Sequence, residues 1–207
     1  MGLWAEQVVP RLVEAALGSA QHDSLRAQAC APLAGQVVEV GFGSGRNVPH
    51  YPAAVGLVTA IEPSDVAWRL SADRRAAAAV PVERAGLDGQ ALPFPNASFD
   101  SALSTWTMCT IPNPVAALRE LARVLRPGGS LSFVEHGAAP DPGVLRWQRR
   151  LDPLQRRVAA GCHLSRPIDA LLSEAGLHVV ALQREYARGE PRPFGSLFVG
   201  RAVHARP

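Results

Sequence analysis

The sequence predicts a single α/β domain in which helices cover both faces of a mostly parallel β-sheet. Its 207 residues are the length of one ordinary domain. From residue 36 onward, short apolar runs typical of buried strands alternate with stretches of helical period. Strands separated by single helices form parallel β-α-β units, which leaves a helix layer on each side of the sheet. No internal repeat divides the chain, so we expect one domain over residues 1–207.

The strands of this sheet are expected where apolar runs of strand length occur between turn residues. The last two runs are joined by the segment ARGEPRPF, whose proline and glycine residues fit the connection of a hairpin at one end of the sheet. The seven expected strands cover residues 36–40, 56–62, 80–84, 99–105, 130–136, 177–186 and 195–203.

Three helices are expected between these strands. The first begins at Ser64, and the second begins at Asn113 and ends at the Pro-Gly-Gly segment 127–129. A third spans Ser165–Ala175. The apolar residues expected on the buried faces of the first two helices are Val66, Leu70 and Ala77, followed by Val115, Leu118, Leu121 and Leu125.

Two further segments are additions to this alternating core. Residues 1–34 are expected to form an N-terminal amphipathic helix with Trp4, Val8 and Leu12 at fourth-residue spacing. Residues 137–165 are expected to form an extra helical segment whose arginines lie on a solvated face. Because both segments lie outside the alternating core, we expect the first to be a helical lid and the second a helical insertion over a ligand pocket.

The composition excludes several classes of protein. No run of about eighteen apolar residues could span a membrane, and charged residues come too early for a signal peptide, so we expect no integral membrane segment and a cytoplasmic location. All 21 basic side chains are arginine, which excludes Schiff-base chemistry on lysine. A net charge of +3 is too small to indicate nucleic acid. Cys30, Cys109 and Cys162 form no CxxC pair, so we expect neither a disulfide framework nor a metal site.

The strongest sign of a binding site is the segment Glu39–Gly45, EVGFGSG, at the end of the first strand. Its glycines allow a tight turn and a close approach of the backbone to a ligand, and the N–H groups that follow can bind an anion. A dinucleotide fingerprint requires a third glycine where this chain has Arg46. The acid at the start of the segment suits a ligand that carries an amino group.

Two more acids follow the next two strands. Glu62 lies 21 residues after Gly41, at the place where a carboxylate accepts the hydroxyls of a ribose in nucleoside-binding α/β sheets. Asp88 lies in the turn after the third strand, where an acid can accept the exocyclic amine of adenine. The three acids together indicate a ligand with an amine, a ribose and an adenine in that order.

Four motifs in this order resemble those of the class I S-adenosylmethionine-dependent methyltransferases: EVGFGSG, the acid of AIEPS, DGQALPFPNASFD and ELARVLRPGG. The third is similar to the methyltransferase-11 branch. The resemblance covers a cofactor-binding core over residues 36–135 and implies a Rossmann-like fold with seven strands in the order 3-2-1-4-5-7-6, strand seven antiparallel. It also implies S-adenosylmethionine as cofactor and S-adenosylhomocysteine as product. The implied cofactor-binding residues are Glu39, Gly41, Phe42, Gly43, Gly45, Asn47, Glu62, Pro63, Asp88, Gly89 and Thr105.

A narrower resemblance covers most of the remaining chain. The segments STWTMCTIPNP, FVEH, WQRRLDP and GCHLSRP are similar to small methyltransferase-like proteins that methylate alkyl thiols. Animal members of that group have an N-terminal membrane anchor, and we expect no counterpart of it here. The resemblance implies a small, largely apolar acceptor, with a thiol as the narrower possibility. The residues expected at the acceptor are the catalytic candidates His136 and His163 and the pocket residues Trp106, Cys109, Trp147 and Cys162.

The chemistry agrees with a thiol acceptor. His136 ends the fifth strand, on the side of the sheet where ligands bind. An imidazole has a pKa of about 6.5 and a thiol one of about 8.5, so a histidine can take a thiol proton near neutral pH. Trp106 can either line the pocket or pack in the core, and buried cysteines such as Cys109 and Cys162 are more often packing residues than reactive ones.

Several alternatives stay open at this stage. The acceptor can be a phenol, a quinone or another small metabolite, and the protein can bind the cofactor without turnover. An NAD-dependent oxidoreductase is disfavoured by Arg46 and by the lack of a Tyr-x-x-x-Lys motif. The sequence does not determine the oligomeric state.

Overall fold

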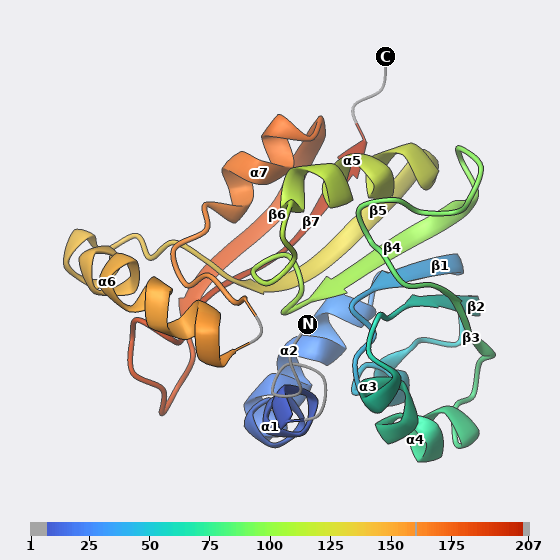
Figure 1. The fold of residues 1–207 in the computed structure, drawn as a ribbon. Helices are drawn as coiled ribbons and strands as arrows, with labels where there is room; N and C mark the ends of the chain where they lie inside the picture. Colours follow the sequence, from blue (N-terminus) through green and yellow to red (C-terminus); the bar gives the residue numbers. More distant parts are fainter. Residues whose placement is uncertain (1–7, 160, 205–207) are drawn as a thin grey trace.

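The centre of the molecule is a seven-stranded sheet, seen edge-on between its helix layers in the computed structural model, which describes residues 8–159 and 161–204 (Figure 1). The strand order is β3-β2-β1-β4-β5-β7-β6, which confirms the expected fold. The neighbours from β3 to β5 are parallel, whereas β7 is antiparallel to both β5 and β6. The strands are β1 Gly35–Val40, β2 Val55–Ile61, β3 Val82–Gly86, β4 Phe99–Thr105, β5 Leu125–His136, β6 Leu177–Tyr186 and β7 Ser196–His204.

Two strands begin more than one residue away from the expected position. β3 begins at Val82 because Pro81, which has no N–H for a ladder, contributes only its carbonyl oxygen to Val58. β5 begins five residues early, at Leu125, directly after a helix. The Pro-Gly-Gly segment is accommodated inside this strand, where Gly128 has a φ of 87° and the register with β4 shifts.

The helices cover both faces of the sheet. On one face, α5 (Pro114–Val124) and α7 (Ile168–Glu174) bury leucines such as Leu118 and Leu172 against β1, β4 and β5. On the other face, α2 (Ala20–Cys30) buries Leu25 and Ala29 against residues of β1, β4, β5 and β7. Each apolar face of the sheet therefore has its own core.

The N-terminal segment is two helices and not one. α1 (Val9–Ala16) is separated from α2 by Gly18 and by Ser19, whose hydroxyl caps α2 by accepting the N–H of His22. The expected apolar stripe is only partly buried, because Val8 is half-buried, Leu12 is 50% exposed and Val9 is the buried residue of α1. Trp4, the first residue of that stripe, lies outside the described residues.

Two further helices differ from the expected ones, namely the helix after β2 and the helix α7. The helix after β2 is split into α3 (Asp65–Leu70) and α4 (Ala72–Ala76) at Ser71, whose buried hydroxyl donates to the carbonyl of Trp68. α7 begins only after Pro167, because a proline disfavours helix in the residue before it. α6 (Pro142–Val158) lies at one end of the molecule, and Gln148 is its buried residue (Figure 1). Among the helices of the described residues, none is long and apolar enough to span a membrane.

Candidate active site

The candidate site lies at the edge of the sheet where the parallel strands β1 to β5 end. In sheets of this kind ligands bind outside the carboxyl ends of the strands, near the point where the strand order reverses. Here that point is between β1 and β4, which are neighbours in the sheet. Gly41, Glu62, Thr105 and His136 all lie at strand ends on this edge.

The glycine loop after β1 has a backbone that only glycine adopts readily. Gly41, Gly43 and Gly45 have φ angles of 76°, 60° and 76°. At Gly41 a Cβ atom would lie 1.9 Å from the hydroxyl oxygen of Thr107, so this glycine is required for packing. At Gly43 the nearest described atom would be the Gly41 carbonyl oxygen, 3.9 Å away. The loop is therefore packed at its start and has open space at Gly43, as a loop that approaches a ligand requires.

Glu62 joins the end of β2 to this loop. One of its carboxylate oxygens accepts the N–H of Gly43 at 2.7 Å, and the other accepts the N–H of Ser64 at 2.7 Å. Burial raises the pKa of Glu62, and the two backbone hydrogen bonds oppose that shift. The structure thus brings the acid after β2 into contact with the glycine loop.

Beneath the loop lies a buried polar network centred on Glu39. Its carboxylate accepts the side-chain amide of Asn47 at 2.9 Å and the hydroxyl of Tyr51. Arg26 of α2 donates to Asn47 Oδ1 at 3.0 Å and to Thr105 Oγ1 at 3.3 Å. Because Glu39 is fully buried, desolvation raises its pKa to about 7. Three residues predicted to bind the cofactor, Glu39, Asn47 and Thr105, therefore form part of the support under the loop.

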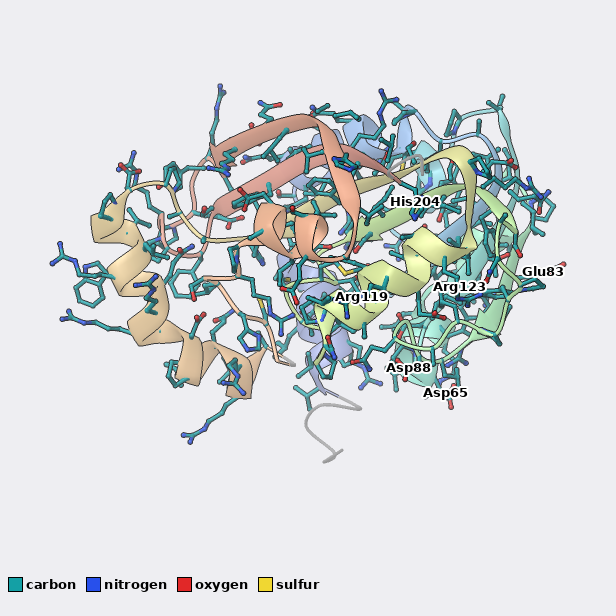
Figure 2. The ribbon with its side chains drawn as sticks, turned by 90° about the horizontal axis from the view of Figure 1, so that it is seen from above. Asp65, Glu83, Asp88, Arg119, Arg123 and His204 are labelled. Carbon is teal, nitrogen blue, oxygen red and sulfur yellow. The ribbon has the colours of Figure 1, made fainter. Side chains whose placement is uncertain are left out.

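The remaining predicted cofactor residues are divided between the surface and the core. Asp88 is exposed, and its carboxylate accepts both N–H groups of Gln90, from the backbone at 2.8 Å and from the side chain at 3.0 Å. Figure 2 shows Asp88 and Asp65 near the same edge of the molecule. A Cβ atom on buried Gly89 would lie 2.6 Å from Val40, which explains the glycine there. Pro63 is exposed, and Phe42 is buried against Trp68 with ring centroids 5.4 Å apart.

The N-terminal helix α1 contacts the glycine loop through Glu14. This carboxylate pairs with Arg46 at 2.8 Å and with Arg74 of α4 at 2.7 Å, and it accepts the hydroxyl of Ser44. Partial burial would raise the pKa of Glu14, but the hydrogen bonds from Ser44 and Arg74 outweigh it and hold the pKa below its usual value. The expected lid segment is thus linked directly to the loop that would hold a cofactor.

At the ends of β4 and β5, three residues far apart in sequence meet. Cys109 Sγ and Cys162 Sγ are 3.8 Å apart, and His136 Nδ1 lies 4.0 Å from the first sulfur and 3.6 Å from the second. The hydrogen bond between the two thiols, together with burial, raises the pKa of Cys109, and the same hydrogen bond lowers the pKa of Cys162. Burial would lower the pKa of His136, but its contact with Cys109 outweighs this and raises it. We call these three residues the sulfur–histidine cluster.

Comparison with known proteins identifies the family. A family model described as "Methyltransferase domain" matches residues 38–133. Thiol S-methyltransferase TMT1B of Mus musculus is 30% identical over 173 residues, which is 81% of this chain and 70% of the relative. Phosphatidylethanolamine N-methyltransferase of Cereibacter sphaeroides is 29% identical over 155 residues, or 70% of this chain and 71% of that protein. This chain belongs to the class I S-adenosylmethionine-dependent methyltransferases.

Solved structures agree on the fold of the methyltransferase. A S-adenosylmethionine-dependent methyltransferase of Thermotoga maritima has a TM-score of 0.67 to it at 21% sequence identity, over 97% of this chain and 100% of that one. At this identity the likeness concerns the fold alone. The expected seven-stranded Rossmann-like architecture is confirmed by it and by the strand order.

Trp106 packs in the core of the methyltransferase, on the face of the sheet that α2 covers. Its ring is buried beneath α2, with the guanidinium of Arg26 4.6 Å from the ring centroid and the ring of His22 edge-on at 5.2 Å. Its backbone φ is 51°, in the left-handed region that is uncommon for a non-glycine residue. The residue therefore turns the chain sharply at the end of β4 and so directs the following loop toward Cys109.

The other expected acceptor residues lie in different places. The N–H of His163 donates to the carbonyl of Cys109 at 2.8 Å, so the loop after α6 is tied to the sulfur–histidine cluster. Trp147 lies on α6 and is 56% exposed, beside a surface hollow of about 500 Å³ that Asp141, Arg192 and Pro193 also line. The structure brings Cys109, His136, Cys162 and His163 together, and it does not place Trp147 among them.

Sequence reasoning missed Glu135 as a site residue. This acid is fully buried in β5, where its carboxylate accepts the hydroxyl of Ser104 at 2.7 Å and the N–H groups of Thr107 and Cys109 at 3.1 Å. Burial raises its pKa. The sequence did contain a signal for Glu135, which lies in the apolar run SLSFVEH. A buried acid in a central strand needs hydrogen-bond donors around it. Arg26 and Tyr51, which lie outside the motifs they support, carry no such signal.

Proposed function

We propose that this methyltransferase transfers the methyl group of S-adenosylmethionine to the sulfur of a small, largely apolar thiol. The observation that carries the proposal is the position of His136, half-buried at the end of β5 and in contact with Cys109 and Cys162. A thiol must lose its proton before it becomes a good nucleophile, and its ordinary pKa of about 8.5 is within reach of such a site. The 30% identity to a thiol S-methyltransferase supports the same acceptor class.

The residues around the glycine loop fit the cofactor. The open space at Gly43 would admit a ligand against the backbone, and Glu62 lies beside it to accept hydroxyl groups of a ribose. Asp88 and Gly89, after β3, would contact the adenine. When bound, the cofactor supplies a methyl group on a sulfonium, so the protein needs to orient the acceptor and exclude water more than to activate the methyl. We assign Glu39, Asn47 and Thr105 to the support of the loop.

The acceptor would reach this site under the two helical additions. Glu14 of α1 forms an ion pair with Arg46, directly after the glycine loop. The N–H of His163, in the segment 137–165, donates a hydrogen bond to the carbonyl of Cys109. Such coverage suits a small molecule better than a nucleic acid or a protein. Of the two catalytic candidates, His136 is the stronger because its ring contacts the sulfur atoms, whereas the contact of His163 with Cys109 is through its backbone.

We also propose a cytoplasmic location. All three cysteines of the described chain are free and buried, including the two whose sulfurs lie 3.8 Å apart. Neighbouring thiols persist in a reducing compartment and tend to oxidise outside it.

The test is methyl transfer from labelled S-adenosylmethionine to a panel of acceptors: alkyl thiols, thiophenols, phenols, quinones, carboxylic acids, phosphatidylethanolamine vesicles and RNA. We expect thioether products and stoichiometric S-adenosylhomocysteine with thiols, and none with Gly43→Val. Transfer to phenols, quinones or lipid without transfer to thiols would contradict the thiol assignment. Cofactor binding without transfer to any acceptor would favour a non-catalytic binding protein.

A further inference from the structure

We propose that Cys109, His136 and Cys162 bind one zinc ion, and that the open fourth position of this ion binds the acceptor thiolate. The first half of the proposal stands on the geometry of the sulfur–histidine cluster alone. The second half rests on the proposed thiol acceptor. Together they give the cluster a function that a free imidazole beside two buried thiols would not have.

The distances in the cluster are those of a tetrahedral zinc site. Zinc binds thiolate sulfur at about 2.3 Å and imidazole nitrogen at about 2.0–2.1 Å, so tetrahedral angles separate two sulfurs by about 3.8 Å and a sulfur from a nitrogen by about 3.6 Å. The observed separations are 3.8 Å between the sulfurs and 3.6 and 4.0 Å from the sulfurs to His136 Nδ1. All three donor atoms lie within 4.8 Å of one another. The ligands can thus close around an ion with small side-chain movements.

The donor set indicates which metal and which kind of site. Two thiolates and one imidazole suit zinc, whereas magnesium and calcium prefer oxygen ligands. Structural zinc sites have four protein ligands, but catalytic zinc sites have three and leave one position for water or substrate. Among the described residues, the cluster offers three such ligands. Its composition therefore matches an open zinc site and not a closed one.

The protein fixes each of the three ligands through its neighbours. Glu135 accepts the N–H of Cys109 at 3.1 Å, and the carbonyl of Cys109 accepts the N–H of His163, the residue after Cys162. The guanidinium of Arg166 donates to the carbonyl oxygens of Met108 and Ile111, on both sides of Cys109. Outer contacts of this kind orient metal ligands before the ion binds. The loop of Cys109, the loop of Cys162 and the end of β5 are therefore held together without the ion.

Two charged side chains near the cluster oppose each other: the carboxylate of Glu135 disfavours a thiolate here, and the guanidinium of Arg166 favours one. A zinc ion with two cysteine thiolates has no net charge, and an acceptor thiolate would make the site negative. Arg166, which interacts electrostatically with both cysteines and with Glu135, is partly buried nearby and would offset part of that charge. A cationic neighbour at this place would stabilise the thiolate of the acceptor as well as those of the ligands.

The step balances in atoms and electrons. The acceptor thiol gives its proton to water as its sulfur displaces the water bound to zinc. The acceptor sulfur then donates an electron pair to the methyl carbon, and the bond from that carbon to the sulfonium sulfur breaks. S-Adenosylhomocysteine and the methyl thioether leave, and the zinc ion is unchanged in oxidation state. His136 acts here as a ligand, so the ion and not a free imidazole lowers the pKa of the thiol.

The first test is the metal content of the full chain. The protein is equilibrated with zinc under a phosphine reductant, desalted and analysed by inductively coupled plasma mass spectrometry. We expect about one zinc per chain, and a loss of at least tenfold in zinc affinity in Cys109→Ser and in Cys162→Ser. Cys30→Ser is the matched control, because Cys30 is equally buried but lies outside the cluster. Circular dichroism establishes that the variants are folded, and His136→Gln provides a third, independent ligand loss.

The second test uses cobalt in place of zinc and needs no turnover. We expect the intense visible bands of tetrahedral cobalt and a thiolate-to-cobalt charge-transfer band, both altered when an alkyl thiol is added and unaltered by the alcohol of the same chain. A wild-type chain that takes up no zinc under reducing conditions would overturn the proposal, as would a Cys109–Cys162 disulfide in its place. Metal binding without a spectral response to thiols would overturn the proposal that the fourth coordination position binds the acceptor thiolate. Equal thiol methylation by the metal-free protein would refute the zinc step and leave the proposed function standing.

Discussion

The two halves of the site lie at one edge of the same sheet but are built in different ways. The cofactor half is centred on one continuous segment, residues 39–47, together with Glu62, whose carboxylate accepts the N–H of Gly43 in that segment. The acceptor half is built from Cys109, His136 and Cys162, which are 26 and 27 residues apart and meet only in the fold. The first half can be recognised from local sequence, and the second only from the packing of three segments.

This difference predicts that the two halves fail separately when they are mutated. Changes in the loop should alter cofactor affinity, because we propose that the cofactor lies against this loop. Changes in the sulfur–histidine cluster should alter the rate of methyl transfer and leave cofactor affinity as it is. The predictions below test this separation.

The largest effect is expected for Gly43→Val. The valine side chain would fill the open space beside the loop, and Gly43 has a φ of 60°, which a β-branched residue adopts with strain. Binding of S-adenosylhomocysteine should fall below detection in isothermal titration calorimetry. Gly176→Val is the matched control, since Gly176 has a φ of 82° and a Cβ there would meet no described atom within 4 Å. If both variants bind equally, the loop is not where the cofactor lies.

The next effect is expected for His136→Ala. The rate of thiol methylation should fall about 10²-fold or more, which is the usual contribution of a group that activates a nucleophile. The affinity for S-adenosylhomocysteine should stay within about twofold, because the ring contacts the two cysteines and not the loop. His178→Ala, at an exposed position of β6, is the control. A parallel loss of cofactor affinity would remove the distinction between the two halves.

A smaller effect is expected for Glu62→Ala. Hydrogen bonds to a charged group contribute about 1.5–3 kcal/mol, so the cofactor affinity should fall by roughly 10- to 150-fold. The same change frees the N–H of Gly43, which now donates to this carboxylate. Glu83→Ala, on the exposed side of β3 and labelled in Figure 2, should have no effect on binding. An unchanged affinity in Glu62→Ala would show that this acid orders the loop without contacting the ligand.

The smallest effect concerns stability and its dependence on pH. Burial raises the pKa of Glu39 from 4.5 to about 7, so the folded protein holds a proton that the unfolded chain has lost between these values. The free energy of unfolding should therefore fall as the pH rises from about 4.5 to about 7, with a slope of at most about 1.4 kcal/mol per pH unit from this group. Glu39→Gln should show a flatter profile over this window in urea titrations. If wild type and Glu39→Gln show the same pH dependence of the free energy of unfolding, the proton taken up by the folded protein is not on Glu39.

The sequence predicted the features whose signals are local. Strand runs, the glycine loop and the acid after β2 each depend on neighbouring residues, and the strand order followed from the resemblance that these motifs carry. The sequence analysis did not predict the helix breaks at Ser19 and Ser71. The first depends on the hydroxyl of Ser19 capping α2, and the second on the buried hydroxyl of Ser71 bonding the carbonyl of Trp68. The resemblance implies that Glu39 contacts the cofactor, and it does not indicate that the hydroxyl of Tyr51 bonds this carboxylate.

The acceptor half was predicted as separate candidates and not as a cluster. Cys109 and Cys162 share no spacing that indicates a metal site, and periodicity gives no distance between them. The two cysteines come together because the loop after α6 packs against the loop after β4. There the N–H of His163 donates to the carbonyl of Cys109. Trp147 was assigned to the pocket from its position in the insertion, but α6 presents it to solvent.

The most direct test of the account compares one alkyl thiol with the alcohol of the same carbon skeleton as acceptors for deuterated-methyl S-adenosylmethionine. The two differ in one atom, so their kcat/KM values report on the chemistry of the acceptor half and not on pocket size. Mass spectrometry should find the deuterated methyl on sulfur, with a kcat/KM for the alcohol that is at least about 10²-fold lower. Equal methylation of both, or methylation of the oxygen alone, would contradict the assignment of this enzyme to thiols.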